Sequence, residues 1–138
     1  MMSIASKQQE IVQEFAMFPT WMEKYEYIIE LGKDLDTMEE LAKTEDHLIK
    51  GCQSRVWLTA QKREDGTFHF AADSDAIITK GIVALVVRVF EGERGEDIVP
   101  APLDFLKEIG LMENLSPSRS NGLAAMIKQI KTYALIMQ

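Results

Sequence analysis

The chain has 138 residues, of which 46% are hydrophobic and 27% charged, and its formal net charge is −7. These values are ordinary for one globular domain, which we expect to span residues 1–138. The acidic balance opposes nucleic-acid binding, because that binding rests on neutralising phosphates with Lys and Arg. No apolar run is long enough for a bilayer and the N-terminus lacks a signal peptide's apolar core, so we expect a cytoplasmic protein without a membrane partner.

The N-terminal third of the chain has the signals of helices. A short amphipathic helix is expected to stop before Pro19, because the residue before a proline disfavours helical geometry. Thr20 begins a second helix, in which Glu23 completes a capping box and Gly32 stands at the position of a C-cap. Residues 37–44 are expected to add a short helix.

The middle of the chain alternates like a β-hairpin. Val56–Lys62 is followed by a turn at Asp65-Gly66 and by a returning strand over residues 67–71. The next stretch, residues 75–90, is rich in Ile and Val and could be a strand. Its length and its polar interruptions favour a helix packed across the sheet, with Ser74 as the cap.

Helical signals return in the C-terminal third. After a loop over residues 91–95, a helix is expected over residues 102–109, ended by Gly110. Ser116 and Pro117 then open a long final helix. Its apolar face is expected to consist of Leu123, Met126, Ile127, Ile130, Ala134 and Met137. The predicted fold is therefore α+β, with a small antiparallel β-sheet covered by helices.

Cys52 is the only cysteine, so it can neither close an internal disulfide nor supply the several ligands of a structural metal site. A lone cysteine is more often a small buried hydrophobe. Here Gly51 permits a sharp turn, and Lys50 and Arg55 place two cations nearby, which favours the thiolate. The hydrophobic run starts only at Val56. We therefore expect a reactive thiol at the mouth of a strand, without a metal or an organic cofactor.

The octapeptide around Cys52 reads Gly51-Cys52-Gln53-Ser54-Arg55-Val56-Trp57-Leu58. It resembles the active-site segment of the SufE family. These are sulfur-acceptor proteins that work with cysteine desulfurases in iron–sulfur cluster assembly. Three further stretches resemble the same family in order and spacing: WMEKYEYIIELG (residues 21–32), DSDAIITKG (73–81) and LSPSRSNGL (115–123). The resemblance covers nearly the whole chain and implies a SufE/IscU-like single domain.

The resemblance also implies a function for Cys52. This thiol would take sulfane sulfur from the persulfide of a pyridoxal-phosphate-dependent cysteine desulfurase and carry it to a downstream cluster-assembly scaffold. Such a transfer follows the chemistry of thiol–disulfide exchange and needs one thiolate, so the chain would be an accessory protein rather than an enzyme. Gly51, Gln53, Ser54 and Arg55 would form the supporting loop.

Two more segments are candidates for supporting this loop. Asp73-Ser74-Asp75 is most simply a helix cap with an acidic first turn. Alternatively, this turn lies beside the cysteine loop and shields it or docks the partner. Arg119 stands near a helix start, where positive charge is unfavourable, so we expect it to brace the loop together with Asp75. A shielded resting position of Cys52 follows as a hypothesis.

Two other classes of protein compete with the sulfur acceptor. A scaffold on which clusters are built would need about three cysteines, because thiolates hold the iron. A cysteine hydrolase would need a Cys–His pair, for which His47 and His69 are the only candidates. His47 lies in a polar stretch and is expected to be solvated. His69 stands between Phe68 and Phe70, which face the opposite side of the strand, so we expect it to be exposed.

Overall fold

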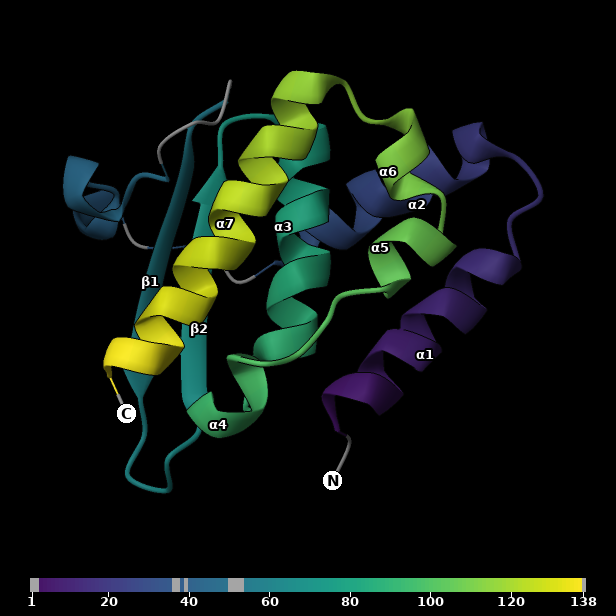
Figure 1. Cartoon of the computed structure of the whole chain (residues 1–138). Coiled ribbons are helices and arrows are strands. Elements are labelled where there is room, and N and C mark those ends of the chain that lie inside the picture. Colours follow the sequence, from purple (N-terminus) through teal and green to yellow (C-terminus); the bar gives the residue numbers. More distant parts are fainter. Residues whose placement is uncertain (1–2, 36–37, 39, 50–53, 138) are drawn as a thin grey trace.

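The computed structural model describes residues 3–35, 38, 40–49 and 54–137 (Figure 1). It confirms the predicted α+β fold, with one two-stranded antiparallel sheet in the described residues. The helices are α1 Ile4–Ala16, α2 Trp21–Lys33, α3 Ile77–Phe90, α4 Gly95–Ile98, α5 Phe105–Glu108, α6 Leu111–Asn114 and α7 Pro117–Ile136, with two 3-10 turns, η1 Glu40–Ala42 and η2 Glu45–His47.

The sheet is the hairpin that the alternating pattern predicts. Strand β1, Val56–Lys62, runs antiparallel to β2, Phe68–Ser74, with Val56 opposite Ser74. Gly66 in the turn has a φ of 89°, which a residue with a Cβ rarely adopts. Strand β2 continues three residues beyond the expected end at residue 71, because its last residues pair with the beginning of β1.

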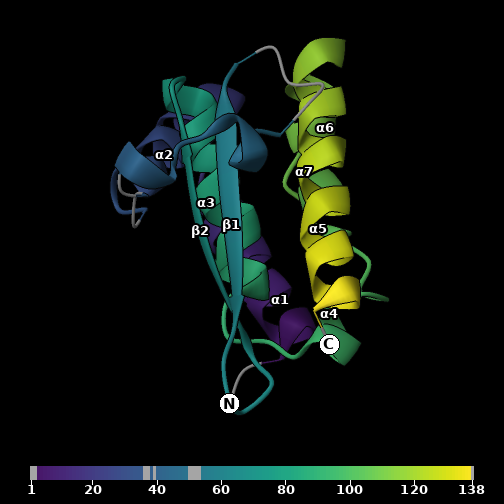
Figure 2. The same cartoon turned by 90° about the vertical axis from the view of Figure 1, so that its left-hand side faces the viewer.

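One face of the hairpin is buried under helices. Alternate residues of both strands point into the core, as the two-residue period of a strand requires, and each is at most 2% exposed: Val56, Leu58, Phe68, Phe70 and Ala72. Helices α3 and α7 run alongside the hairpin and pack against β2 and β1 respectively (Figures 1 and 2). The prediction of a sheet covered by helices is therefore confirmed for this face.

The Ile- and Val-rich stretch forms helix α3 rather than a strand. Most of its residues are buried, since it lies between the sheet, α1 and α2. The expected cap is wrong: Ser74 is the last residue of β2, and Ala76 takes the N-cap position without a side-chain bond. Ser74 is held in the strand by pairing with Val56, and its Oγ accepts the Ala76 N–H at 3.2 Å.

Helix α2 begins as predicted but ends later. The Thr20 Oγ1 accepts the Glu23 N–H at 3.2 Å, as in a capping box. Gly32 is not the C-cap, because the helix continues to Lys33. Gly32 is buried where α2 crosses α3, and a Cβ there would lie 2.8 Å from the Gly81 nitrogen. This glycine therefore serves close helix packing rather than helix termination.

Three other elements differ in extent from their predictions. Helix α1 is longer than expected, because the Ser3 side chain caps its first turn. Helix α5 covers Phe105–Glu108 instead of residues 102–109, although Gly110 follows it with a φ of 84°. In its described part, the expected helix over residues 37–44 contains only a 3-10 turn.

Helix α7 matches its prediction closely. The Ser116 Oγ accepts the Arg119 N–H at 3.3 Å and Pro117 is the first helical residue. The expected apolar face is buried at Leu123, Met126, Ile130 and Ala134 and partly buried at Ile127 and Met137. Across the residues described above, neither this helix nor any other is long and apolar enough to span a membrane.

Candidate functional site

The predicted nucleophile and its two neighbours, Gly51, Cys52 and Gln53, lie outside the described residues. The described chain ends on one side at Ile49 and resumes on the other at Ser54. Both positions lie at the end of the sheet where β1 begins, so the site is described by the residues that flank and surround this point.

The segment that precedes Cys52 is anchored to β1. Leu48 forms an isolated antiparallel bridge with Trp57. The Ile49 N–H donates to the Val56 carbonyl oxygen at 2.8 Å, and the Ile49 side chain is buried in the core. These contacts make residues 48–49 a short extension of the sheet along the edge of β1.

The segment that follows Cys52 is anchored to the turn after β2. The Arg55 N–H donates to the Asp75 Oδ1 at 3.0 Å, and the Asp75 N–H donates to the Arg55 carbonyl oxygen at 3.2 Å. Asp75 is therefore beside the segment that follows the predicted nucleophile, as the functional interpretation of this turn expected. The simpler interpretation of Asp73-Ser74-Asp75 as a helix cap is wrong, since Ala76 is the N-cap of α3.

A small apolar cavity brings Ser54 and Arg119 together. It has a volume of about 30 Å³ and lies between the start of β1 and the first turns of α3 and α7. Its lining consists of Ser54, Val56, Thr79, Ile82, Val83, Ser118, Arg119, Gly122, Leu123 and Met126. Arg119 itself is exposed, and its backbone N–H is used in the cap of α7. Its expected bracing of the cysteine loop stays a prediction.

Asp73 is a site residue whose partners the sequence pattern did not reveal. Its Oδ2 lies 2.8 Å from the Lys43 Nζ and its Oδ1 lies 3.4 Å from the Lys80 Nζ. Burial by itself would raise the pKa of this carboxyl, but hydrogen bonds from Lys43 and the Ser74 N–H, with the charge of Lys80, lower the pKa below its usual value. Nothing in the spacing of residues 43 and 73 signals the contact.

Comparison with known proteins identifies the family. The family model "SufE: Fe-S metabolism associated domain" matches residues 9–134, which is most of the chain. The chain belongs to the SufE family. Two curated relatives are uncharacterized SufE-like proteins. The relative from Rhizobium meliloti (strain 1021) is 41% identical, and the match covers 91% of this chain and 92% of the relative. The relative from Rhizobium etli (strain ATCC 51251 / DSM 11541 / JCM 21823 / NBRC 15573 / CFN 42) is 37% identical, and the match covers 92% of this chain and 88% of the relative.

A solved structure shares the fold of this SufE-family chain. It is the solution structure of a hypothetical protein from Thermus thermophilus, with a TM-score of 0.76 and 20% sequence identity over 94% of each chain. At this identity the likeness supports the architecture alone. The SufE assignment places the protein in iron–sulfur metabolism.

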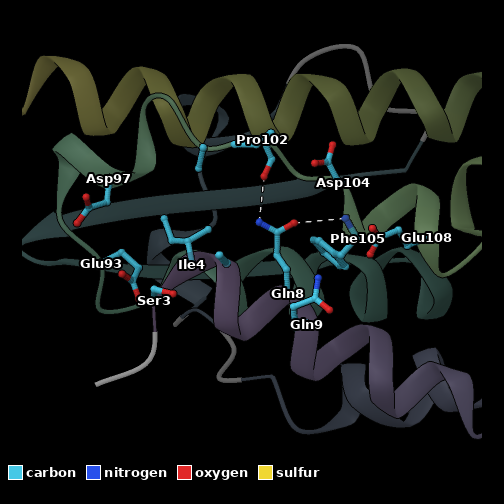
Figure 3. Close-up of a pocket in the computed structure, with 12 residues that line it drawn as sticks. Ser3, Ile4, Gln8, Gln9, Glu93, Asp97, Pro102, Asp104, Phe105 and Glu108 are labelled. Atoms are coloured by element: carbon cyan, nitrogen blue, oxygen red, sulfur yellow. Dashed lines mark hydrogen bonds between the residues drawn. The ribbon is translucent and has the colours of Figure 1, made fainter.

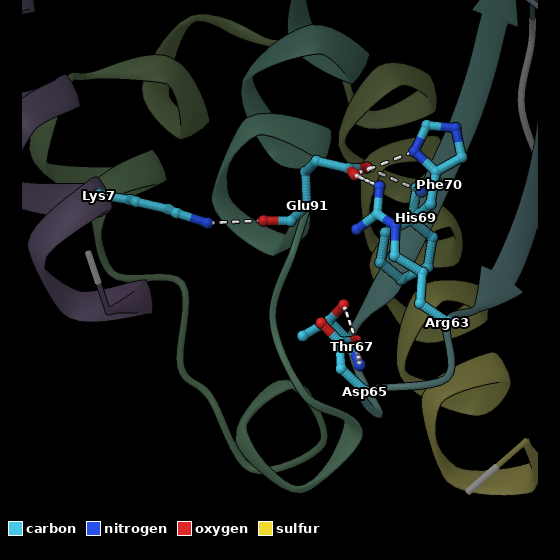
Figure 4. A network of polar contacts seen from close by, with 7 residues as sticks. All are labelled: Lys7, Arg63, Asp65, Thr67, His69, Phe70 and Glu91. Carbon is cyan, nitrogen blue, oxygen red and sulfur yellow. Dashed lines mark hydrogen bonds and ion pairs between the residues drawn. The ribbon is translucent and has the colours of Figure 1, made fainter. Parts of the chain in front are cut away.

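The two histidines of this SufE-family protein lie in different parts of the fold. His69 lies opposite Gln61, five positions along the sheet from the Val56–Ser74 pair, which corresponds to about 17 Å. Its Nδ1 lies 3.0 Å from the Glu91 Oε2 in a polar network at the far end of the hairpin (Figure 4). The His69 side chain is 40% exposed, in line with the expectation, and Phe68 and Phe70 face the opposite side.

The other histidine is tied to the backbone of its own segment. The His47 Nδ1 lies 2.7 Å from the Ala42 carbonyl oxygen, and the residue is half-buried rather than solvated. Within the residues that the structure describes, no three His, Cys, Asp or Glu side chains come together in a way that could hold a metal ion.

A much larger cavity of this SufE-family protein lies elsewhere. It measures about 600 Å³ and is bordered by α1 and by the segment that leads into α5 (Figure 3). Gln8 crosses it, donating from Nε2 to the Pro102 carbonyl oxygen at 2.9 Å and accepting the Phe105 N–H at 3.3 Å. Because its amide is committed to these backbone groups, Gln8 serves to fasten α1 to α5 rather than to bind a ligand.

Proposed function

We propose that this SufE-family protein is a sulfur acceptor for a pyridoxal-phosphate-dependent cysteine desulfurase. Cys52 is the nucleophile and then the carrier of a persulfide that is passed to a cluster-assembly scaffold. The protein acts as an accessory that stimulates the desulfurase, in a reducing cytoplasm that suits a free thiol. It forms one domain over residues 1–138.

The transfer step balances without any further reagent. The thiolate of Cys52 attacks the terminal sulfur of the desulfurase persulfide, and a new sulfur–sulfur bond forms on Cys52. The sulfur–sulfur bond in the desulfurase breaks, and its cysteine leaves as a thiolate. The sulfane sulfur keeps its oxidation state, so neither a metal nor a redox cofactor has to take part.

The observation that carries the proposal is the double anchoring of the chain on both sides of Cys52. Ile49 is bonded to Val56 on one side, and Arg55 is bonded to Asp75 on the other. Both attachment points lie at the same end of the sheet, so the described segments that flank Cys52 are held close to one place. A nucleophile that must meet a second protein benefits from such a defined location.

The electrostatics of this end of the molecule also support a thiolate. Helices α3 and α7, of 14 and 20 residues, both begin there, as the cavity lining of Thr79, Ser118 and Arg119 shows. Helix N-termini carry partial positive charge, and Arg119 adds a full one. Both favour an anionic sulfur over a neutral thiol at a nearby position.

The test is to incubate the protein with a cysteine desulfurase and cysteine and to analyse Cys52 by mass spectrometry. We expect one added sulfur atom on the peptide that contains Cys52, removable by a reductant. The same incubation without the desulfurase is the control and should leave the peptide unmodified. Turnover of a substrate without a desulfurase, or no added sulfur with one, would reject the proposal.

A further inference from the structure

We propose that Asp73, acting through Lys43, is a positioning residue for sulfur transfer, because this ion pair anchors the segment that leads into Cys52. The inference rests on the proposed function above. It concerns described residues on three elements: the loop between η1 and η2, strand β2 and helix α3. None of them is expected to touch the transferred sulfur, so the effect would be transmitted through the backbone.

The ion pair lies in a sheltered place on the outer face of the hairpin. The Lys43 and Asp73 side chains are 16% and 7% exposed, and the Nζ–Oδ2 distance is 2.8 Å. The Lys43 Nζ also lies 5.6 Å from the centre of the Trp57 ring, and Trp57 is the cross-strand partner of Asp73. Lys43 is therefore held by a carboxylate and an aromatic ring that belong to adjacent strands.

The low solvent exposure of the Lys43–Asp73 pair distinguishes it from an ordinary surface salt bridge. Exposed ion pairs contribute little, because water competes for both charges. A pair that is largely out of water is different, because a sheltered charge depends more on its partner. Removing Lys43 would leave Asp73 with the longer contact to Lys80, and removing Asp73 would leave Lys43 paired with the exposed Glu40. Hydrogen bonding to Asp73 and then to Glu40 raises the pKa of Lys43, so the ammonium is charged at neutral pH.

The Lys43–Asp73 ion pair lies at the start of residues 43–49, and the end of this segment is bonded to β1. Lys43 begins the segment, and Leu48 and Ile49 end it with the bridge to Trp57 and the bond to Val56. The backbone between these points contains only the 3-10 turn η2. Without the ion pair, the segment would be held mainly at the end next to Cys52. The pairing of Ile49 with β1 should then open more often.

Asp73 has a second contact that provides an internal comparison. Lys80 of α3 reaches the same carboxylate at the longer distance of 3.4 Å. Lys80 belongs to a helix that does not lead into Cys52, so its removal should leave residues 43–49 anchored. Positioning of the cysteine segment should depend on Lys43 more than on Lys80, although both lysines neutralise the same carboxylate.

The experiment measures the amide hydrogen exchange of Ile49 and the kinetics of sulfur transfer in the variants Lys43→Met and Asp73→Asn. We expect amide hydrogen exchange of Ile49 to become about tenfold faster, because a hydrogen bond between charged groups contributes on the order of that factor to an equilibrium. In sulfur transfer from the desulfurase we expect kcat to fall by a similar factor while KM changes little, because a positioning residue affects the transfer step rather than the encounter of the two proteins. In Lys43→Arg both quantities should stay near their wild-type values, since a guanidinium can bind the same carboxylate.

Two control variants make the result specific. Lys7→Met breaks the Lys7–Glu93 ion pair, which is similarly sheltered, with side chains 18% and 12% exposed, but joins α1 to the loop after α3. It should leave Ile49 exchange and kcat unchanged, and Lys80→Met should have a smaller effect than Lys43→Met. Wild-type exchange and kcat in a folded Lys43→Met protein would overturn the inference. A wild-type protein that accepts no sulfur would instead overturn the proposed function.

Discussion

Gly81 of α3 lies directly against the backbone of Ile28 in α2. A Cβ at position 81 would come within 2.1 Å of the Ile28 carbonyl oxygen. Gly32 of α2 faces the same crossing, so the two helices meet backbone to backbone. Helix α3 is in turn packed against the sheet, and its first turn borders the cavity beside Ser54. The glycine contact therefore sets how closely α2 approaches the helix that supports the candidate site.

The first prediction concerns Gly81→Ala. Replacing a glycine inside a helix by alanine normally stabilises the helix by about 1 kcal/mol. Here we expect the free energy of unfolding to fall by about 3 kcal/mol, since the added methyl group would overlap backbone atoms that cannot move without separating the helices. Urea denaturation measures the difference. An unchanged or higher stability would show that α2 and α3 do not cross at this glycine.

The second prediction concerns Cys52→Ser. We expect a folded protein of wild-type stability that accepts no sulfur above the background of the assay and no longer stimulates the desulfurase. The reason is that no other thiol exists in the chain to replace Cys52. Circular dichroism checks the fold, and mass spectrometry after incubation with desulfurase and cysteine checks acceptance. Sulfur acceptance at the wild-type rate would remove Cys52 from the mechanism.

The third prediction concerns Asp75→Ala, which removes the carboxylate that accepts the Arg55 N–H. We expect a loss of about 1 kcal/mol in stability, typical of one hydrogen bond, and faster hydrogen exchange of the Arg55 amide. Asp75→Asn keeps an acceptor oxygen and should be intermediate. Equally slow exchange of the Arg55 amide in the wild-type protein and both variants would contradict this prediction.

The fourth prediction concerns acid stability and Glu14. The hydrogen bond from Arg88 lowers the pKa of Glu14 below its usual value of 4.5, burial opposes this, and the Tyr27 hydroxyl lowers the pKa further. The unfolded chain therefore binds this proton at higher pH than the folded protein does. Its contribution to stability is present above the unfolded pKa and is lost as the pH falls through the folded pKa.

Glu14→Gln should accordingly flatten the decrease in stability on acidification. Urea denaturation of both proteins from about pH 3 to about pH 7 measures this, and we expect the two stabilities to converge at low pH. Asp73 and Glu91 also have lowered pKa values, so the variant should retain part of the acid dependence. Parallel curves for the two proteins would contradict an ion-paired Glu14.

Several structural features could be predicted because their causes are local. The capping of α2 by Thr20 and of α7 by Ser116 follows from hydroxyl groups three residues before a free N–H. The hairpin follows from alternation around Asp65-Gly66, and the helical form of α3 from the length of its apolar run. The contact of Asp75 with the segment after Cys52 was one of two alternatives, since cap and loop contact look alike in sequence.

Other features could not be predicted because they depend on pairs that are distant in the chain. Gly32 has the position of a C-cap, and only the crossing with Gly81 reveals its actual role. Ser74 has the chemistry of a cap, but pairing with Val56 keeps it in the strand. The carboxylate of Asp73 has two lysine partners from separate elements, and no spacing rule connects them.

The α+β fold, the single thiol and the resemblance to SufE proteins, which the family model confirmed, could all be inferred from the chain alone. These depend on residue type, periodicity and order, which are all carried by the chain. The anchoring of Ile49 to β1 and of Arg55 to Asp75, and the start of α3 and α7 beside Ser54, are visible only in the folded protein. Burial and charge pairing are properties of surfaces in contact, and these surfaces form only when segments far apart in sequence pack together.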